Sequence, residues 1–175
     1  MSRKVLAQSP KRLIAAAVLM IIITAAAVLI SFLSSDYLVL YNSDTGARYI
    51  TQKAEDGLMF SVEFIHSVNQ TPVKDTYIIE DKQIRAYSTT YRSFGAGVQT
   101  ALQEGQKMTY DENGNMVITG FDFTYDPLRY IVGTVSDHIL TIDGKEISLR
   151  DMCGRNAMVV FDVASLFEIL TKGLL

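Results

Sequence analysis

One long uncharged segment constrains this 175-residue chain more than any other feature. Residues 13–33 read LIAAAVLMIIITAAAVLISFL, with no charged side chain and only two polar ones, Thr24 and Ser31. As a helix the segment would be about 31 Å long, which matches the roughly 30 Å hydrocarbon core of a bilayer. A buried helix of a water-soluble protein would carry a polar stripe, whereas this segment is apolar on every side. It therefore predicts a membrane-spanning helix.

The charges on either side of this segment predict its orientation. Four of the 16 basic residues precede it, Arg3, Lys4, Lys11 and Arg12, and the first acidic residue is Asp36. The positive-inside rule then makes residues 1–12 a cytoplasmic basic N-terminus, 13–33 a transmembrane signal anchor and 36–175 an extracytoplasmic domain. The chain is thus predicted to be a single-pass protein of the cell membrane, with the lipid bilayer as a partner.

Two further features bear on the anchor and on the exported part. Ala25 to Ala27 could be a cleavage site for a signal peptidase. The apolar stretch, however, is longer than the apolar core of a usual signal peptide, so an uncleaved anchor is favoured. After residue 35 the chain has 12 basic and 19 acidic residues, a net charge of −7. That balance excludes a basic surface that follows DNA, and no nucleic-acid partner is expected.

From Tyr37 onward the dominant sequence period is two, the period of a β-strand with one buried face. Phe60, Val62 and Phe64 alternate with Ser61 and Glu63, which predicts that the three hydrophobic side chains share the buried face. Similar segments, rich in β-branched and aromatic residues, predict strands at 37–41, 75–80, 83–91, 107–110, 116–119, 121–125, 139–142, 145–148 and 158–163. Helix is expected only at Ala164 to Leu170.

The connections between these segments are typical of hairpins. Asp143-Gly144 separates two strand-like segments by two residues, and Asn113-Gly114 lies between another two. Turn residues recur at intervals of about 8–12 residues. The sequence therefore predicts one mainly β domain, an antiparallel β-sandwich or barrel.

Few residues offer catalytic or metal chemistry. His66, His138 and Cys153 are too widely spaced for a zinc motif. In the stretch that begins at Asp111, Met116 and Asp122 stand at the positions where a calcium loop has glycine and glutamate. No nucleophile elbow, dinucleotide fingerprint or phosphate loop is present. We expect no metal, no cofactor and no assigned catalytic residue. The single cysteine can form no disulfide within the chain.

Two segments remain as candidates for binding. His66 ends a strand-like segment and is followed by a polar loop and Pro72, and the run from Tyr91 to Gly97 combines an aromatic, a cation and two glycines. Loops at the rim of a β scaffold often carry binding residues, although both segments could simply turn the chain. The residues predicted to bind a ligand or partner are His66, Ser67, Thr71, Phe94, Gly95, Ala96 and Gly97.

The same segments carry a family resemblance. The chain resembles the family known as domain of unknown function 1850 from about Tyr37 to Val163. The likeness lies in four motifs: Leu38 to Leu40 with Asp44 to Gly46, Phe64 to Val68 with Thr71 to Val73, Ser93 to Gly97, and Asp137 to Leu140. Val98 and Gln99 stand where members often carry leucine and proline.

The resemblance implies a small exported or membrane-anchored protein without an assigned activity. It also implies genes that lie beside tripartite ATP-independent (TRAP) transporters of the TAXI type. The predicted role is a non-enzymatic accessory or binding module of such a transporter, with TRAP subunits as partners. An extracytoplasmic enzyme with His66 as acid or base, paired with Glu63 or Asp75, and a structural envelope protein are the alternatives.

Overall fold

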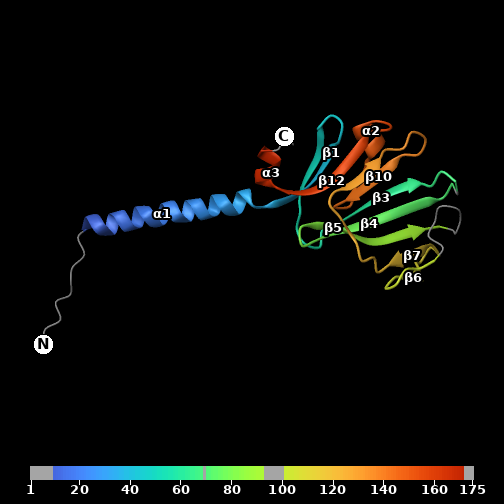
Figure 1. Ribbon diagram of the computed structural model, residues 1–175, viewed down its shortest axis with the longest axis horizontal. Coiled ribbons are helices and arrows are strands. Elements are labelled where there is room, and N and C mark those ends of the chain that lie inside the picture. Colours follow the sequence, from blue (N-terminus) through green and yellow to red (C-terminus); the bar gives the residue numbers. More distant parts are fainter. Residues whose placement is uncertain (1–9, 69, 93–100, 172–175) are drawn as a thin grey trace. The chain divides into compact units, whose positions relative to one another are not determined.

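The computed structural model describes residues 10–68, 70–92 and 101–171, and the chain divides into two units, residues 1–35 and 36–175. The described part of the first unit contains α1 (Pro10–Leu33), shown in blue in Figure 1. None of its residues is buried inside the protein. α1 is long and apolar enough to cross a membrane, properties that a signal sequence near the N-terminus would share.

The second unit is mainly antiparallel β-sheet, as the sequence predicts. One sheet has the order β2-β1-β12-β9, and the other has the order β11-β10-β3-β4-β5-β7-β6, with β8 paired to β5. The bounds of the first sheet are β1 Asp36–Asn42, β2 Arg48–Lys53, β9 Leu128–Ile131 and β12 Met158–Ser165. Those of the second are β3 Met59–Ile65, β4 Pro72–Glu80, β5 Gln83–Tyr91, β6 Lys107–Tyr110, β7 Met116–Thr119, β8 Thr124–Tyr125, β10 His138–Ile142 and β11 Lys145–Ser148. The short helices are α2 (Leu149–Cys153) and α3 (Leu166–Thr171).

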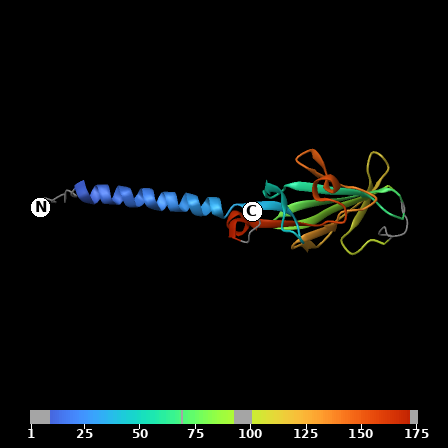
Figure 2. The same cartoon turned by 90° about the horizontal axis from the view of Figure 1, so that it is seen from above.

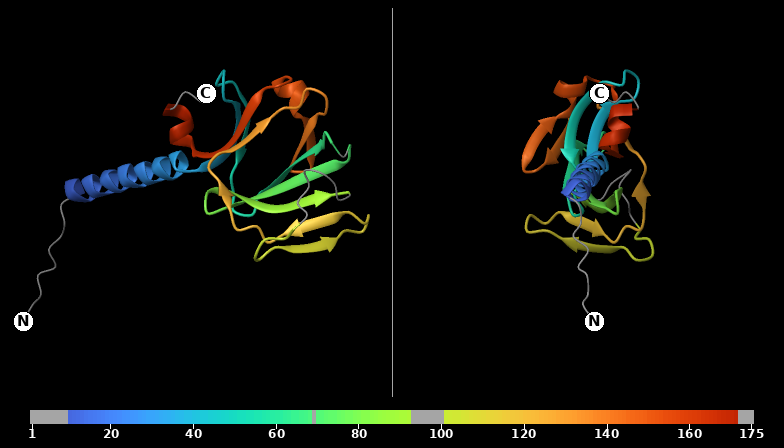
Figure 3. Two further views of the ribbon diagram at one scale, coloured as in Figure 1. Left: turned by 45° about the vertical axis from the view of Figure 1, so that its right-hand side comes forward. Right: turned by 90° about the vertical axis from the view of Figure 1, so that its left-hand side faces the viewer.

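The two sheets face each other as a sandwich and do not close into a barrel over the described residues (Figure 3). The long strands of both sheets lie along roughly the same axis and alternate in direction, as Figure 2 shows from above. This is the aligned type of sheet packing, in which the inward side chains of both sheets form one core.

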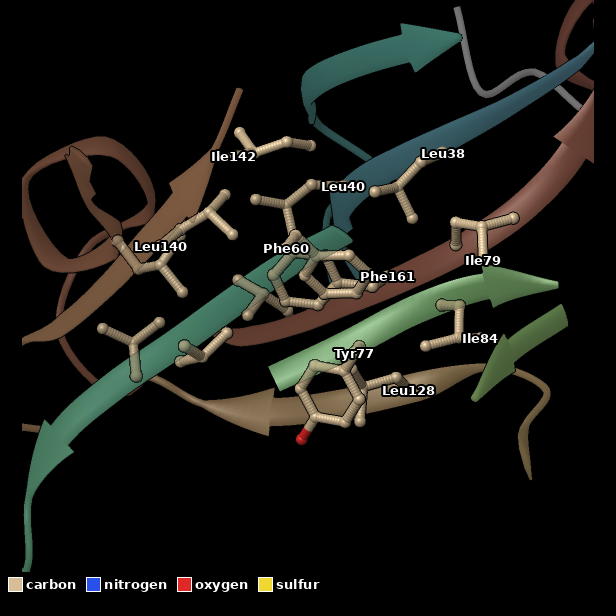
Figure 4. Packing of buried hydrophobic residues seen from close by; sticks show 14 residues of the cluster. Leu38, Leu40, Phe60, Tyr77, Ile79, Ile84, Leu128, Leu140, Ile142 and Phe161 are labelled. Atoms are coloured by element: carbon tan, nitrogen blue, oxygen red, sulfur yellow. The ribbon is translucent and has the colours of Figure 1, made fainter. Parts of the chain in front are cut away.

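The core is built around stacked aromatic rings (Figure 4). The ring of Phe60, from β3, lies 5.2 Å between centroids from that of Tyr77 on β4 and 5.2 Å from that of Phe161 on β12. Leu38 and Leu40 of β1 and Leu140 of β10 complete the contact between the sheets. Because both sheets contribute, neither could bury its apolar face alone.

The predicted buried face of β3 is confirmed at two of its three positions. Phe60 and Val62 are fully buried, with 2% and 0% exposure. Phe64 is half-buried, because it lies near the end of the strand, where its ring stacks on the imidazole of His138. Ser61, on the opposite face, is itself buried.

The predicted hairpin turns are present. Asp143 and Gly144 both have positive φ, 49° and 70°, and connect β10 to β11 with Ile142 opposite Lys145. That geometry fits a two-residue turn whose twist matches the strands. Between β6 and β7 the turn is longer: Asp111 to Asn115 separate Tyr110 from Met116, and Gly114 has a φ of 77°.

Several predicted bounds were wrong. A strand was predicted at 121–125, but only Thr124 and Tyr125 pair with β5; Gly120, with a φ of 80°, turns the chain before them. The predicted helix at 164–170 starts later, at Leu166. Ser165 and Glu168 form a capping box there, in which the carboxylate accepts the Ser165 N–H (3.0 Å) and the serine oxygen accepts the Glu168 N–H (3.2 Å). The strands β2 and β9 and the helix α2 were not predicted.

Candidate functional site

The second unit has two ends, and the predicted binding residues that the structure describes lie at one of them. An ion pair of 3.0 Å between Lys82 Nζ and Asp36 Oδ2 places the β4–β5 turn beside the start of β1. β4 has nine residues, which corresponds to roughly 30 Å of strand. The turn between β3 and β4 therefore lies at the opposite end, which we call the distal end.

His66, Ser67 and Thr71 belong to this distal turn. The His66 N–H donates to the Thr71 carbonyl and the Gln70 N–H donates to the His66 carbonyl, both at 2.9 Å. Gln70 adopts a φ of 53°, and its side-chain amide donates to the Ser67 carbonyl at 2.6 Å. The turn is thus closed by its own hydrogen bonds, and Ser67 and Val68 are exposed at its tip.

The imidazole of His66 takes part in the same turn. Its Nδ1 accepts a hydrogen bond from the Val68 N–H at 3.3 Å. The carboxylates considered as catalytic partners make other contacts: Asp75 binds Thr89 and Tyr130, and Glu63 lies beside Lys74 on the neighbouring strand. Phe94, Gly95, Ala96 and Gly97, predicted as the second part of the site, lie outside the described residues.

A groove with polar walls lies on the outer face of the second sheet, next to the distal turn. It has a volume of about 700 Å³. Along each strand its side chains alternate with the core residues, so they point away from the sandwich. The residues that line this polar groove are Glu63, Pro72, Lys74, Thr76, Thr90, Arg92, Asp111, Asn113 and Asn115.

Sheet register brings the groove residues together. Glu63 on β3 lies opposite Lys74 on β4, which lies opposite Thr90 on β5. The wall from the β6–β7 turn is ordered by Asp111, whose Oδ1 accepts the N–H groups of Asn113 (2.9 Å) and Asn115 (2.8 Å). The hydrogen bonds from Asn115 lower the pKa of Asp111 despite a small opposing effect of burial, so its carboxylate is ionised at neutral pH.

A second polar cluster faces inward, between the two sheets. The Asp75 carboxylate accepts hydrogen bonds from the Thr89 hydroxyl (2.9 Å) and the Tyr130 hydroxyl (3.2 Å), and the hydroxyls of Tyr77 and Tyr130 bond to each other. Burial raises the pKa of Asp75, although the two hydrogen bonds oppose this. Burial also raises the pKa values of Tyr77 and Tyr130, so both stay protonated and can donate.

His138 lies at the edge of this inner cluster. Its ring stacks on Phe64 with centroids 5.0 Å apart and meets the edge of Tyr130 at 5.9 Å. Burial lowers its pKa, with a smaller opposing effect from Asp137. Its Nδ1 accepts the Gly133 N–H at 3.1 Å. His138 is therefore a neutral ring that packs and orders the loop before β10.

The described residues contain no group of three or more His, Cys, Asp or Glu side chains that could hold a metal ion. Burial raises the pKa of the Cys153 thiol to about 11, so it is protonated at neutral pH and a poor nucleophile. The polar groove offers charged side chains and hydroxyls that can form ion pairs and hydrogen bonds.

Sequence reasoning did not find most of the groove. Glu63, Lys74, Thr76 and Thr90 are the polar positions of alternating strands, a pattern that any solvated sheet face produces. Arg92 was noticed only as part of the glycine-containing segment. The groove could have been recognised only once the strand register was known, because the register brings the charges of Glu63 and Lys74 and the hydroxyls of Thr76 and Thr90 onto one face.

A family comparison covers most of the second unit. The family model described as Domain of unknown function (DUF1850) matches residues 60–149, just over half of the chain. The chain belongs to this DUF1850 family. The matched segment runs from β3 to the first residue of α2 and contains every residue of the polar groove and of the inner cluster. β1, β2, β12 and α3 lie outside it. No curated protein and no solved structure matches the chain.

Proposed function

We propose that this DUF1850 protein is a membrane-anchored, extracytoplasmic binding module that serves a TRAP-type solute transporter as an accessory subunit. The polar groove, together with the distal turn of His66, Ser67 and Thr71, would be its contact surface. The groove is the observation that carries this proposal. The link to a TRAP transporter has different support, namely the family resemblance.

The chemistry of the groove favours a hydrogen-bonding polypeptide surface as its partner. Its walls offer a cation at Lys74 and at Arg92, anions at Glu63 and Asp111, and hydroxyls at Thr76 and Thr90. Charged side chains of both signs around one groove select a partner by complementary charge rather than by apolar area. An apolar solute would find little to contact there.

The position of the groove supports the same proposal. It lies toward the distal end, whereas Asp36, which follows the apolar helix after Ser34 and Ser35, lies at the other end of the unit. A protein that projects from a membrane would present its distal end to other extracytoplasmic proteins. The basic flank before α1 supports an extracytoplasmic location.

Photocrosslinking in the cells that make the protein tests this proposal. A benzoylphenylalanine placed at Thr90, inside the groove, should crosslink to a transporter or solute-receptor subunit, identified by mass spectrometry. Thr51 provides a matched control, because it is an exposed threonine on β2 of the other sheet. Crosslinks to TRAP subunits from position 90 and not from 51 would support the proposal.

Other results of the same experiment count against it. Equal crosslinking from both positions, or crosslinks from position 90 only to proteins unrelated to transport, would overturn the accessory role. Crosslinks to envelope polymers alone would favour the structural alternative. An exported enzyme with His66 as acid or base would instead lose its activity on substitution of His66 while retaining any groove contact.

A further inference from the structure

The second unit carries an apolar helix face near the point at which the chain enters it. α3 directly follows β12, and β12 pairs with β1 in a register that places Ser165 opposite Asp36. Paired residues on neighbouring antiparallel strands have Cα atoms about 5 Å apart. The start of α3 is therefore fixed beside Asp36, the first residue of β1.

The connection from α1 to Asp36 is short. Only Ser34 and Ser35 separate Leu33, the last residue of α1, from β1. Three extended residue steps span at most about 11 Å. If α1 crosses the bilayer, as the proposed function requires, Asp36 cannot lie far from the lipid headgroups.

α3 itself has one buried and one exposed apolar face. Ile169 is 1% exposed and packs with Val39 and Ala164. Phe167 and Leu170 are 57% and 45% exposed, and three-residue spacing places them on the same side of the helix. The capping box of Ser165 and Glu168 fixes the start of the helix, so this outward face has a defined direction.

We propose that Phe167 and Leu170 insert into the headgroup region of the membrane that holds α1, as a second and peripheral anchor of the domain. Phenylalanine and leucine on one face of a helix are the side chains that bury at such an interface. Three acidic residues lie close to this helix face in sequence or strand register: Asp36, Asp162 and Glu168. Because negative charges repel anionic lipids, the suitable membrane surface is zwitterionic.

The absence of tryptophan from the sequence allows a direct test. The full-length F167W variant, reconstituted into phosphatidylcholine vesicles, has a single tryptophan. Dibrominated phosphatidylcholine, with bromine near the headgroup end of the acyl chain, should quench its emission about twofold or more if the side chain lies in the interface. V68W is the matched control, because Val68 is exposed at the distal turn, and its emission should not change. L170W provides a second site if F167W fails to fold.

Vesicle flotation distinguishes the two proposals. Flotation with quenching at position 167 or 170 and none at 68 would support the peripheral anchor. Flotation without quenching would overturn the peripheral anchor and leave membrane anchoring by α1 intact. A blue-shifted but unquenched tryptophan would show that a second copy, rather than lipid, covers this face. Protein that does not float would overturn the anchoring itself.

Discussion

Asp75 places a carboxyl group among the aromatic side chains that line the inside of the sandwich. Burial raises its pKa, and the hydrogen bonds from Thr89 and Tyr130 offset only part of that effect. A folded-state pKa above the unfolded value, near 3.9 for aspartate, means that the folded state binds the proton more tightly. The contribution of Asp75 to stability is therefore fully present below about pH 3.9 and is lost as the pH rises through the higher folded pKa.

Asp75→Asn should remove this pH dependence. Asparagine has the same shape, its oxygen can accept one hydroxyl, and its amide can donate to the other. We expect the free energy of unfolding of D75N to equal or exceed that of the wild type at pH 7, and the difference to shrink as the pH falls toward 4. Urea denaturation of the purified protein between pH 4 and pH 8 measures both.

Tyr130→Phe is the matched control for this prediction. It removes a hydrogen bond that stabilises the ionised carboxylate, so the pKa of Asp75 should rise further and the loss of stability should extend to higher pH. Identical pH profiles for wild type and D75N would mean that Asp75 titrates in the folded protein as it does in the unfolded chain.

At the scale of the elements, β3 changes from core to rim along its length. Phe60, stacked between Tyr77 and Phe161, is 2% exposed, whereas Phe64 is half-buried against His138. Phe60→Ala should therefore lower the free energy of unfolding by about 3–5 kcal/mol, as full burial of the ring implies. Phe64→Ala should cost clearly less, because solvent reaches part of that site already.

Denaturation midpoints of the two variants under identical conditions compare these costs directly. The alternation in sequence alone makes Phe60 and Phe64 equivalent. A larger loss of stability for Phe60→Ala than for Phe64→Ala would therefore show that burial decreases along the strand. Equal losses would show that the distal half of the sandwich is packed as tightly as its centre.

The elements predicted most closely combine a strong period-two pattern with turn residues at both ends. β5, β6, β7 and β11 have the predicted bounds, and β11 follows the predicted Asp143-Gly144 turn. β2 and β9 were missed; they are the edge strands of the first sheet and pair with β1 and β12. The sequence RYITQK forms a hairpin with the neighbouring strand β1, whereas LRYI becomes a strand by pairing with β12, which lies far from it in the sequence.

The same reasoning explains what sequence could show of the site. The distal turn was recognisable because His66 and Pro72 interrupt a strong strand pattern locally. The polar groove depends on the register Glu63–Lys74–Thr90 across three strands and on a turn ordered by Asp111. Register is a property of pairs of strands, so no single segment of the sequence contains it.

At the scale of the whole molecule, charge divides the chain as sharply as hydropathy does. Four basic residues precede the apolar helix and no acidic one does, whereas the part after it has a net charge of −7. Short basic flanks are retained in the cytoplasm during insertion, and acidic residues have little influence on orientation. The orientation should therefore depend on the four basic residues and not on the acidic domain.

Reporter fusions after Leu175 test this orientation. Alkaline phosphatase, which is active only outside the cytoplasm, should be active there, and β-galactosidase, which is active only inside, should be silent. Replacing Arg3, Lys4, Lys11 and Arg12 with glutamine removes the basic flank, so the fusion population should become mixed. The matched control replaces four exposed lysines and arginines of the domain, Lys107, Arg129, Lys145 and Arg155, and should leave the orientation unchanged because they lie far from the apolar helix in sequence. An active β-galactosidase fusion on the unmodified chain would place the polar groove in the cytoplasm and exclude an extracytoplasmic partner.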